Sequence, residues 1–410
     1  MIKTKIIDTA FRVWGRNFYQ KTSLSQLAKE LGVSKTALYR HFLNKKALTD
    51  AMTESFFDDL AASIRGDLEK ALLTEDADEG IFTIIQSIAG YFGRNVYALL
   101  FSLINIYDRN LNGHTISKHI KTRGADMRTL HLVVDRKYNS NPAILQLIFA
   151  SLTFYMSFFH KKNKSLGKTP SEEKIQDIIS TIYKITKYGL GYSAEQADTL
   201  DFERLENMVE GTMRSVEPEP LFKAVAEAVA EAGPWDASMD MVAKRMGLSK
   251  SSLYGHFKNK KDMLRRLFIS EFKRIIEFAR QGIKLSTNTA EQLYIGIYSI
   301  AVYLRSRPEV LIAIGWIRTR KLDLGKPEKK TEIFRLFEDI KIEPLRGAED
   351  EEKQIASHWI LFLLINTLTR TNYTENEPTE FCLKEVQNTD IRVLYRFITL
   401  GLGGFTRNEV

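Results

Sequence analysis

The sequence contains one thirteen-residue stretch twice, and this repeat constrains the fold more than any other feature. The first copy, SKTALYRHFLNKK, runs from Ser34 to Lys46, and the second, SKSSLYGHFKNKK, runs from Ser249 to Lys261. The copies are identical at nine of thirteen positions without a gap. In a chain of 410 residues the second copy therefore opens the second half. We expect two similar units in series.

Each copy has the pattern of a short cationic helix. It contains four Lys or Arg residues and no acidic residue. Leu38 and Phe42 lie four positions apart in the first copy, so a helix would place both on one buried face. Leu253 and Phe257 repeat this spacing in the second copy. The serine that opens each copy stands where an N-cap side chain accepts a backbone N–H. A capped helix with an exposed cationic face suits the major groove of DNA.

The residues before each copy complete a helix-turn-helix. Apolar periodicity predicts a first helix over residues 4–16 and a second that begins near Ser23 and ends at Gly32. Glycine readily adopts the left-handed conformation that ends a helix. The second half repeats these small, turn and core positions over roughly 45 residues, with Gly247 matching Gly32. Two helices joined by a short Gly-containing turn, behind a supporting helix, form a helix-turn-helix.

Both stretches resemble the DNA-binding domain of the TetR family of bacterial transcriptional regulators. The family pattern reads approximately Gly-Val-Ser-Lys-x-x-Leu-Tyr-x-His-Phe-x-x-Lys. The first copy fills it from Gly32 to Lys45, and the second fills it from Gly247 to Lys260 with Leu in place of Val. The family usually has Gly just before the aromatic residue that ends the first helix, and the first copy has Phe18 there. A typical member carries one such domain and dimerises, whereas this chain carries two.

The resemblance implies specific roles on the exposed face of each recognition helix. The Tyr and His of the motif and the following Lys would contact phosphates, while residues early in the helix and around Arg40 would reach bases. Ser23 and Ser238, at the start of each second helix, would either bind phosphate or only cap. The expected DNA-binding residues of the first copy are Ser23, Lys35, Thr36, Tyr39, Arg40, His41 and Lys45, and those of the second copy are Ser238, Lys250, Ser251, Tyr254, His256 and Lys260.

These motifs favour one function and leave a rival. We expect a sequence-specific transcriptional regulator that binds double-stranded DNA, as a ligand-released repressor with an asymmetric operator. The rival is a ligand-responsive interaction protein in which one or both motifs no longer bind DNA specifically. The second copy favours this rival more than the first copy does. Gly255 stands where the first copy has Arg40, and a glycine has no side chain that could contact a base.

Weaker similarities extend the repeat beyond the two motifs. Ile88–Asn95 resembles Ile300–Arg307, and Ile182–Gly191 resembles Leu394–Gly403, both pairs at one common spacing along the chain. We therefore predict an all-α fold of two fused TetR-like units. The expected segments are a DNA-binding domain over 1–50, a regulatory domain over 51–191, an acidic helical connector over 192–217, a second DNA-binding domain over 218–265 and a second regulatory domain over 266–410.

The two units are expected to act as a pseudo-dimer within one monomeric chain. The apolar helices near 142–160 and 355–370, with the last helix of each unit, would pack as the intramolecular counterpart of the family's dimer interface. Between the units, Tyr192–Pro220 holds eight acidic residues and two arginines, which suggests that it runs over a face away from DNA. Ser193 and Gln196 can form a capping box at its start.

Composition argues against an enzyme and a metal site. A single cysteine, Cys382, excludes an intrachain disulfide and a cysteine metal cluster. His114, His119 and His131 lack other ligands at a workable spacing, and no catalytic signature is present. A net charge of +8 and a pI of about 9.2 favour an anionic partner. No cofactor is expected.

Targeting and membrane signals are weak. Asp8 and Arg12 interrupt the apolar start of the chain, so we expect no signal peptide and a cytoplasmic protein. The longest uncharged run, Asn139–Phe159, contains polar residues, and a second apolar run, Trp359–Leu368, lies in the matching part of the other half. We interpret both as buried helices and expect no membrane association.

Aromatic residues are frequent in the segments that follow each DNA-binding domain. The resemblance implies a small-molecule pocket in each regulatory domain, and the aromatic content favours an apolar or amphipathic inducer. Ordinary core packing is the alternative for most of these side chains, because large apolar side chains are buried by default. No residue identifies the ligand.

Overall fold

The structure, a computed structural model, is described here over residues 2–16, 23–108, 113–139, 141–197, 199–212, 220–255, 260–320, 332–340, 342–369 and 385–407. Across these segments every regular element is a helix, and one isolated antiparallel bridge joins Tyr138 to Thr406. The all-α prediction is therefore confirmed. Phe18 and Cys382 lie outside these segments.

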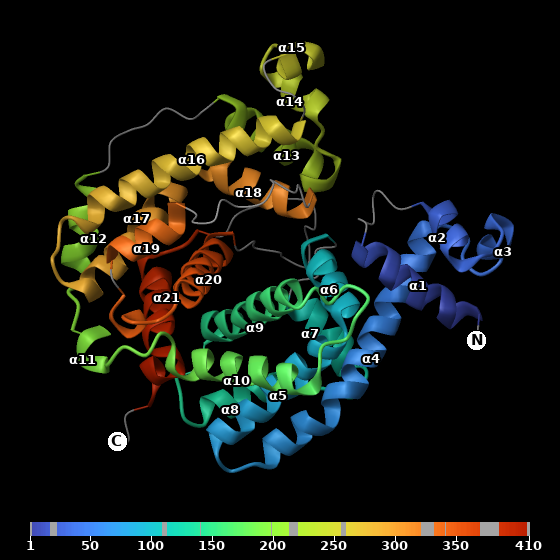
Figure 1. The fold of residues 1–410 in the computed structure, drawn as a ribbon, viewed down its shortest axis with the longest axis horizontal. Helices are drawn as coiled ribbons and strands as arrows, with labels where there is room; N and C mark the ends of the chain where they lie inside the picture. Colours follow the sequence, from blue (N-terminus) through green and yellow to red (C-terminus); the bar gives the residue numbers. More distant parts are fainter. Residues whose placement is uncertain are drawn as a thin grey trace. The chain divides into compact units, whose positions relative to one another are not determined.

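The chain divides into two compact units (Figure 1). Unit 1 comprises Met1–Leu145, Leu152–Lys184 and Thr406–Val410, and unit 2 comprises Gln146–Ser151 and Ile185–Phe405. The helices that begin in the first half of the chain are α1 (Ile2–Arg16), α2 (Leu24–Leu31), α3 (Lys35–Tyr39), α4 (Lys45–Leu73), α5 (Ala77–Arg94), α6 (Val96–Asp108), α7 (Gly113–Lys121), α8 (Arg128–Asp135), α9 (Pro142–Lys162) and α10 (Glu172–Tyr188).

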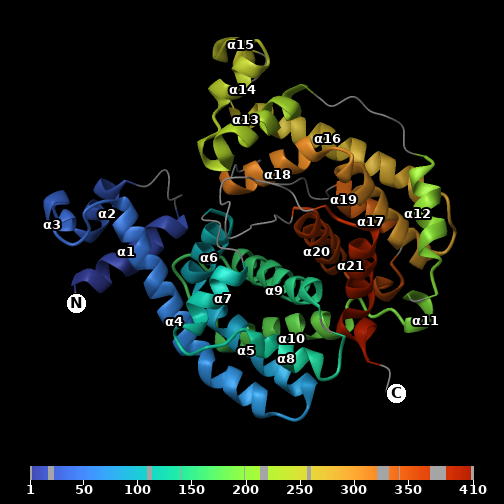
Figure 2. The same ribbon diagram turned by 180° about the vertical axis from the view of Figure 1, so that it is seen from behind.

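Unit 2 continues the chain through the connector and the second repeat. Its remaining helices are α11 (Ala194–Ala197), α12 (Phe202–Glu210), α13 (Pro220–Asp236), α14 (Met239–Arg245), α15 (Lys250–Gly255), α16 (Lys260–Ile283), α17 (Thr289–Arg305), α18 (Pro308–Arg320), α19 (Glu332–Ile340), α20 (Asp350–Leu368) and α21 (Asn388–Leu400), with 3₁₀ turns at Glu343–Leu345 and Gly401–Phe405. Figures 1 and 2 both place α12 at the opposite end of α16 from α14 and α15.

The regulatory parts of the two repeats share structural details at equivalent positions. In unit 1, the hydroxyl of Tyr183 donates to the carbonyl of Asp78 at 3.4 Å, and its ring packs edge-on to Phe82 at 5.0 Å. In unit 2, the hydroxyl of Tyr395 donates to the carbonyl of Ala290 at 3.3 Å. The Tyr395 ring packs edge-on to Tyr294 at 5.2 Å. These matching contacts confirm that the repeat extends beyond the two motifs.

Helix α17 forms the core of unit 2. Every residue from Leu293 to Leu304 is buried, so this helix is covered on all sides, as expected of a central helix. Each fully buried Leu or Ile side chain stabilises the fold by roughly 1.5–3 kcal/mol relative to an exposed one. Helices α16, α18, α19, α20 and α21 all contact it. The position of α17 therefore depends on most of the helices of its unit.

Helix α9 is, among the described helices, the one that is long and apolar enough to cross a membrane. Every residue from Leu147 to His160 is nevertheless buried or half-buried. Ser151 Oγ donates to the Leu147 carbonyl at 2.8 Å and accepts from Trp359 Nε1 at 3.0 Å, a contact within unit 2. Burial and satisfied polar groups of this kind support the interpretation of α9 as a core helix.

Two glycines meet in unit 2 where α10 and α21 end. Gly189 and Gly401 both have positive φ angles, +57° and +58°. A Cβ atom on Gly189 would lie 2.5 Å from the Ile398 carbonyl oxygen, and one on Gly401 would lie 2.5 Å from the Thr186 carbonyl oxygen. The two contacts are reciprocal, because the glycines occupy equivalent places in the two repeats and so do their contact residues. Close backbone contact therefore requires glycine at both positions.

The connector forms two short helices. The predicted capping box is confirmed: Gln196 N donates to Ser193 Oγ at 3.3 Å, and Ser193 N donates to Gln196 Oε1 at 3.1 Å. In α12, Leu205 and Val209 are fully buried, as their helical spacing predicts. Residues 213–219 lie outside the described segments.

Candidate nucleic-acid interface

The second helix of each motif begins with a capping serine. Ser23 Oγ accepts the N–H of Gln26 at 3.2 Å, and the Gln26 side chain accepts the N–H of Ser23 at 3.2 Å, which completes a capping box. Ser238 Oγ accepts the N–H of Met241 at 3.3 Å. The structure therefore assigns both serines the capping role, and this role satisfies one free donor at each helix start.

The turns that follow are alike in both motifs. Gly32 and Gly247 each adopt a left-handed conformation with φ of 67°. Val33 N donates to the Ala28 carbonyl at 3.0 Å, and the same bond recurs at the equivalent residues of the second copy. No heavy atom lies within 4 Å of a Cβ built on Gly32. Glycine is therefore favoured by the backbone conformation and not by lack of space.

The recognition helix α3 is shorter than the repeat suggested. Ser34 Oγ caps it by accepting the N–H of Ala37 at 3.1 Å, and the helix ends at Tyr39, so Arg40 lies at its C-cap. Phe42 N still donates to the Leu38 carbonyl at 3.1 Å. Helical hydrogen bonding thus brings Phe42 onto the same buried face as Leu38, with 3% and 0% of their surfaces exposed.

All but one of the expected contact residues of the first motif face solvent. Lys45 is half-buried in the first turn of α4, which is capped by Asn44 through the N–H of Ala47 at 2.8 Å. The ammonium of Lys35 lies 5.8 Å from the centre of the Tyr39 ring. The expected contact residues with exposed side chains are Ser23, Lys35, Thr36, Tyr39, Arg40 and His41. Contact of these side chains with phosphates and base edges stays a prediction.

The second motif is described less completely. Ser249 Oγ caps α15 by accepting the N–H of Ser252 at 3.0 Å, and Leu253 is buried like Leu38. Ser251 and Gly255 are exposed. The side chains of Lys250, Tyr254 and Lys260, and all of His256, lie outside the described part of the chain, so their placement stays a prediction.

One cation beside the first motif was missed in the sequence analysis. Lys3 Nζ lies 5.6 Å from the centre of the Phe42 ring, which places α1 of unit 1 next to the end of the recognition element. Lys3 and Lys5 are both exposed. The equivalent positions of the second repeat hold Pro218 and Pro220. Two lysines ahead of the first buried residue were the available signal, but only tertiary packing shows their proximity to the motif.

The aromatic residues of α17 belong to the core of unit 2. Tyr294 donates a hydrogen bond to Glu206 at 2.6 Å, and Tyr303 donates to Glu271 at 3.0 Å. Burial and the neighbouring Glu271 carboxylate raise the pKa of Tyr303 to about 12. An open pocket of about 270 Å³ in unit 2 lies instead beside α19 and α20, with Leu345 and Lys353 in its lining.

Metal ligands do not gather anywhere in the described segments. No group of three or more His, Cys, Asp or Glu residues there could hold a metal ion. His119 instead stacks on Phe57 at 4.6 Å.

Comparison with known proteins decides what the two motifs are. The family described as bacterial regulatory proteins, tetR family, matches residues 6–52 and 221–267. The chain carries two TetR-family DNA-binding domains. Both domains of this tandem TetR-type chain cover the helix-turn-helix and the start of the helix that follows it. The arrangement in tandem is therefore confirmed.

Two curated relatives are themselves regulators. The chain is 26% identical over 136 residues to the fatty acid metabolism regulator protein of Bacillus subtilis. This match covers 32% of this chain and 70% of that protein. The chain is also 33% identical over 76 residues to the biofilm operon icaADBC HTH-type negative transcriptional regulator IcaR of Staphylococcus aureus. This second match covers 18% of this chain and 41% of that protein. The match thus spans about two fifths of the staphylococcal protein. Together with the two matched domains, these relatives support a DNA-binding regulator.

Proposed function

We propose that the chain is a transcriptional repressor that binds a duplex operator through both helix-turn-helix domains of one molecule. The observation that carries this proposal is the duplicated domain, with the same serine caps and left-handed glycines in each copy. Repression is supported by the staphylococcal relative, which is named a negative transcriptional regulator. The operator is asymmetric in this proposal, because the two recognition helices differ at Arg40 and Gly255.

Each segment has a role in this function, within the predicted boundaries. Residues 1–50 and 218–265 bind DNA, residues 51–191 and 266–410 form the regulatory domains, and residues 192–217 connect them. The expected contact residues bind phosphates and bases as the family resemblance implies, with Lys3 as an added phosphate contact in the first half. The proposal places the protein in the cytoplasm, where it has access to the chromosome.

Loss of cationic contacts should weaken DNA binding and reduce its dependence on salt. Each neutralised phosphate releases counterions, so the logarithm of the association constant falls with the logarithm of salt concentration by about 0.9 per contact. We expect Lys45→Ala and Lys260→Ala each to flatten this slope by about one contact, and Lys3→Ala to do the same. Fluorescence anisotropy over a salt series measures the slope.

Lys70→Ala is the matched control, because Lys70 is an exposed lysine near the end of α4, far along the helix from the motif. It should leave the slope unchanged. Equal slopes for wild type and both motif variants would contradict the proposal and favour the rival interaction protein.

Release from DNA is proposed to follow binding of an apolar or amphipathic ligand in a regulatory domain. A ligand can shift DNA binding only through different affinities for the free and DNA-bound conformations. An inducer should therefore raise the unfolding temperature of the free protein more than that of the operator complex. Thermal unfolding with and without operator, screened over amphipathic compounds, measures this difference. Equal stabilisation of both forms by every binding compound would refute release by ligand.

A further inference from the structure

The turn between α16 and α17 is tied to the connector. Helix α16 starts directly after the second helix-turn-helix and ends at Ile283, and α17 starts at Thr289. The turn therefore lies at the far end of the helix that carries the second DNA-binding domain, and α12 lies at this same end (Figures 1 and 2). Whatever holds this turn limits how α16 can move.

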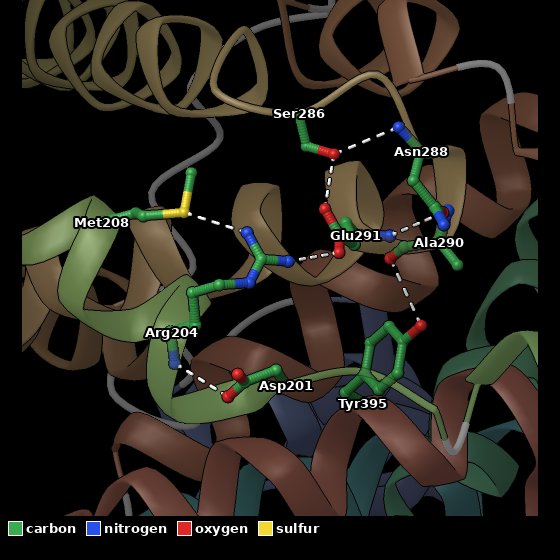
Figure 3. A network of polar contacts seen from close by, with 8 residues as sticks. All are labelled: Asp201, Arg204, Met208, Ser286, Asn288, Ala290, Glu291 and Tyr395. Atoms are coloured by element: carbon green, nitrogen blue, oxygen red, sulfur yellow. Dashed lines mark hydrogen bonds and ion pairs between the residues drawn. The ribbon is translucent and has the colours of Figure 1, made fainter.

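A chain of polar contacts joins α12 to the turn (Figure 3). Arg204 of α12 forms an ion pair with Glu291. The other carboxylate oxygen of Glu291 accepts from Ser286 Oγ at 2.5 Å, and Ser286 Oγ accepts the N–H of Asn288 at 3.1 Å. Asn288 Oδ1 in turn caps α17 by accepting the N–H of Ala290 at 2.9 Å. The connector thus contacts the first turn of α17 directly, and through Glu291 it is linked to Ser286 in the turn that follows α16.

A buried carboxylate anchors the middle of α12. Glu206 has only 4% of its surface exposed, and it accepts hydrogen bonds from Tyr294 at 2.6 Å and from Asn388 at 3.0 Å. Arg392 binds it through two nitrogens, both at 2.8 Å. Burial alone would raise the pKa of Glu206, but the hydrogen bonds from Arg392 and Tyr294 hold it below the ordinary value. A charged, fully bonded carboxylate fixes the position of the helix that bears it.

Unit 1 holds its equivalent turn in a different way. The turn between α4 and α5 receives two hydrogen bonds from Arg136, to the carbonyl of Leu72 at 2.6 Å and to that of Thr74 at 2.5 Å. Lys137 binds Asp78 at 2.6 Å. The residues that bind this turn follow α8, so a loop with basic residues holds the turn of unit 1.

The equivalents of the α12 anchor are absent from unit 1. The positions of the first repeat that correspond to Tyr294, Asn388 and Arg392 hold Phe82, Gln176 and Ser180. None of these side chains can reproduce the bidentate contact to a carboxylate. The anchor is therefore particular to the second repeat.

We infer that α12 acts as a strap that positions the second DNA-binding domain by fixing the α16–α17 turn. This inference rests on the proposed function. A domain that must adopt one orientation on DNA binds more tightly when its freedom is already restricted, because less conformational entropy is lost. Arg204 and Glu206 are thus positioning residues for the second half-site, and they touch no DNA themselves.

Two variants weaken the contacts of α12 without leaving a cavity in the core. Arg204→Ala removes a side chain that is 45% exposed, and Glu206→Gln keeps the shape of the buried group but removes its charge. Each is measured by anisotropy on the complete operator and on operators with one half scrambled. We expect the affinity for DNA to fall about tenfold wherever the second half-site is intact, which is within the usual range for coupled sites. The affinity should not change when only the first half-site is intact. Arg136→Ala is the matched control and should affect the first half-site alone.

A second measurement needs no DNA. Spin labels at Lys244→Cys in α14 and Glu352→Cys in α20, with Cys382→Ser, report the distance between the second DNA-binding domain and its regulatory domain. Both strap variants should broaden the distance distribution while far-ultraviolet circular dichroism stays unchanged. An unchanged distribution, or equal losses on both half-sites, would overturn the strap. A wild-type protein that binds no operator would instead refute the proposed function, and the spin-label result would still decide the strap.

Discussion

Arg40 and Gly255 mark the clearest difference between the two DNA-reading surfaces. Arg40 is exposed at the end of α3, and Arg can bond guanine bidentately with about 1–3 kcal/mol of discrimination between bases. We expect Arg40→Gly to relax selection at one base pair in the first half-site and to leave the second half-site unchanged. Gly255→Arg should make the preferred site more nearly palindromic. Selection of binding sites from a random pool measures both effects.

The design of this test depends on whether Gly255 tolerates a side chain. No heavy atom lies within 4 Å of a Cβ built there, and its φ angle is not positive, so an arginine fits without strain. If Arg40 contacted only phosphate, Arg40→Gly would weaken binding to all sequences alike. A symmetric consensus for the wild-type protein would contradict the asymmetric operator.

At the same scale, local rules predicted some residues of the interface and missed others. The caps at Ser23 and Ser34 and the left-handed Gly32 follow from short-range hydrogen bonding and backbone geometry, so the sequence was sufficient. The burial of Phe42 followed from helical spacing although α3 ends before it. Lys3 could not be found, because its distance from the motif depends on how α1 packs against it.

At the scale of helices, the meeting of α10 and α21 gives a test of stability. A Cβ on Gly401 would lie 2.6 Å from the Gly189 nitrogen, too close for backbone atoms that cannot move aside. We expect Gly401→Ala to lower the free energy of unfolding by about 3–5 kcal/mol, which is large for one substitution. Equilibrium unfolding in urea measures the loss.

Gly191→Ala provides the matched control. Gly191 also has a positive φ of +87°, but no heavy atom lies within 4 Å of its Cβ position. Only the cost of the left-handed conformation remains there, about 1–2 kcal/mol. Similar losses at both positions would show that the close contact contributes nothing to stability.

The connector shows why a helix can be predicted when its contacts cannot. The capping box and the apolar stripe of α12 follow from the sequence within a few residues. The acidic composition predicted only that the connector runs over a face away from DNA, and it did not indicate that Glu206 is buried. Its partners Asn388 and Arg392 come from the last helix of the chain, and no local pattern links them to it.

At the scale of the whole molecule, the duplicated domain predicts an unusual stoichiometry. Because one chain carries two recognition helices, a single molecule should fill one operator, with the helices about 34–36 Å apart, one turn of DNA. Light scattering of the purified complex should give the mass of one chain plus one operator.

A complex with the mass of two chains would contradict this stoichiometry and require a longer site for four helix-turn-helices. The tandem organisation could be predicted from the sequence because the repeated motif is long and aligns without a gap. The sequence could not place the contacts that fix each regulatory domain, since they join residues distant in the chain.

The covalent connector also determines how the regulator responds to its own abundance. When a regulator that assembles from two separate chains is diluted, the concentration of the active dimer falls with the square of the concentration of free chains. In the one-chain complex proposed here, the second recognition helix is always present at an effective concentration fixed by the connector, of millimolar order for short links. At low occupancy, the fraction of occupied operators would then be proportional to the number of regulator molecules per cell. Such a protein could hold a gene silent with few molecules per cell and restore that state promptly after cell division halves their number.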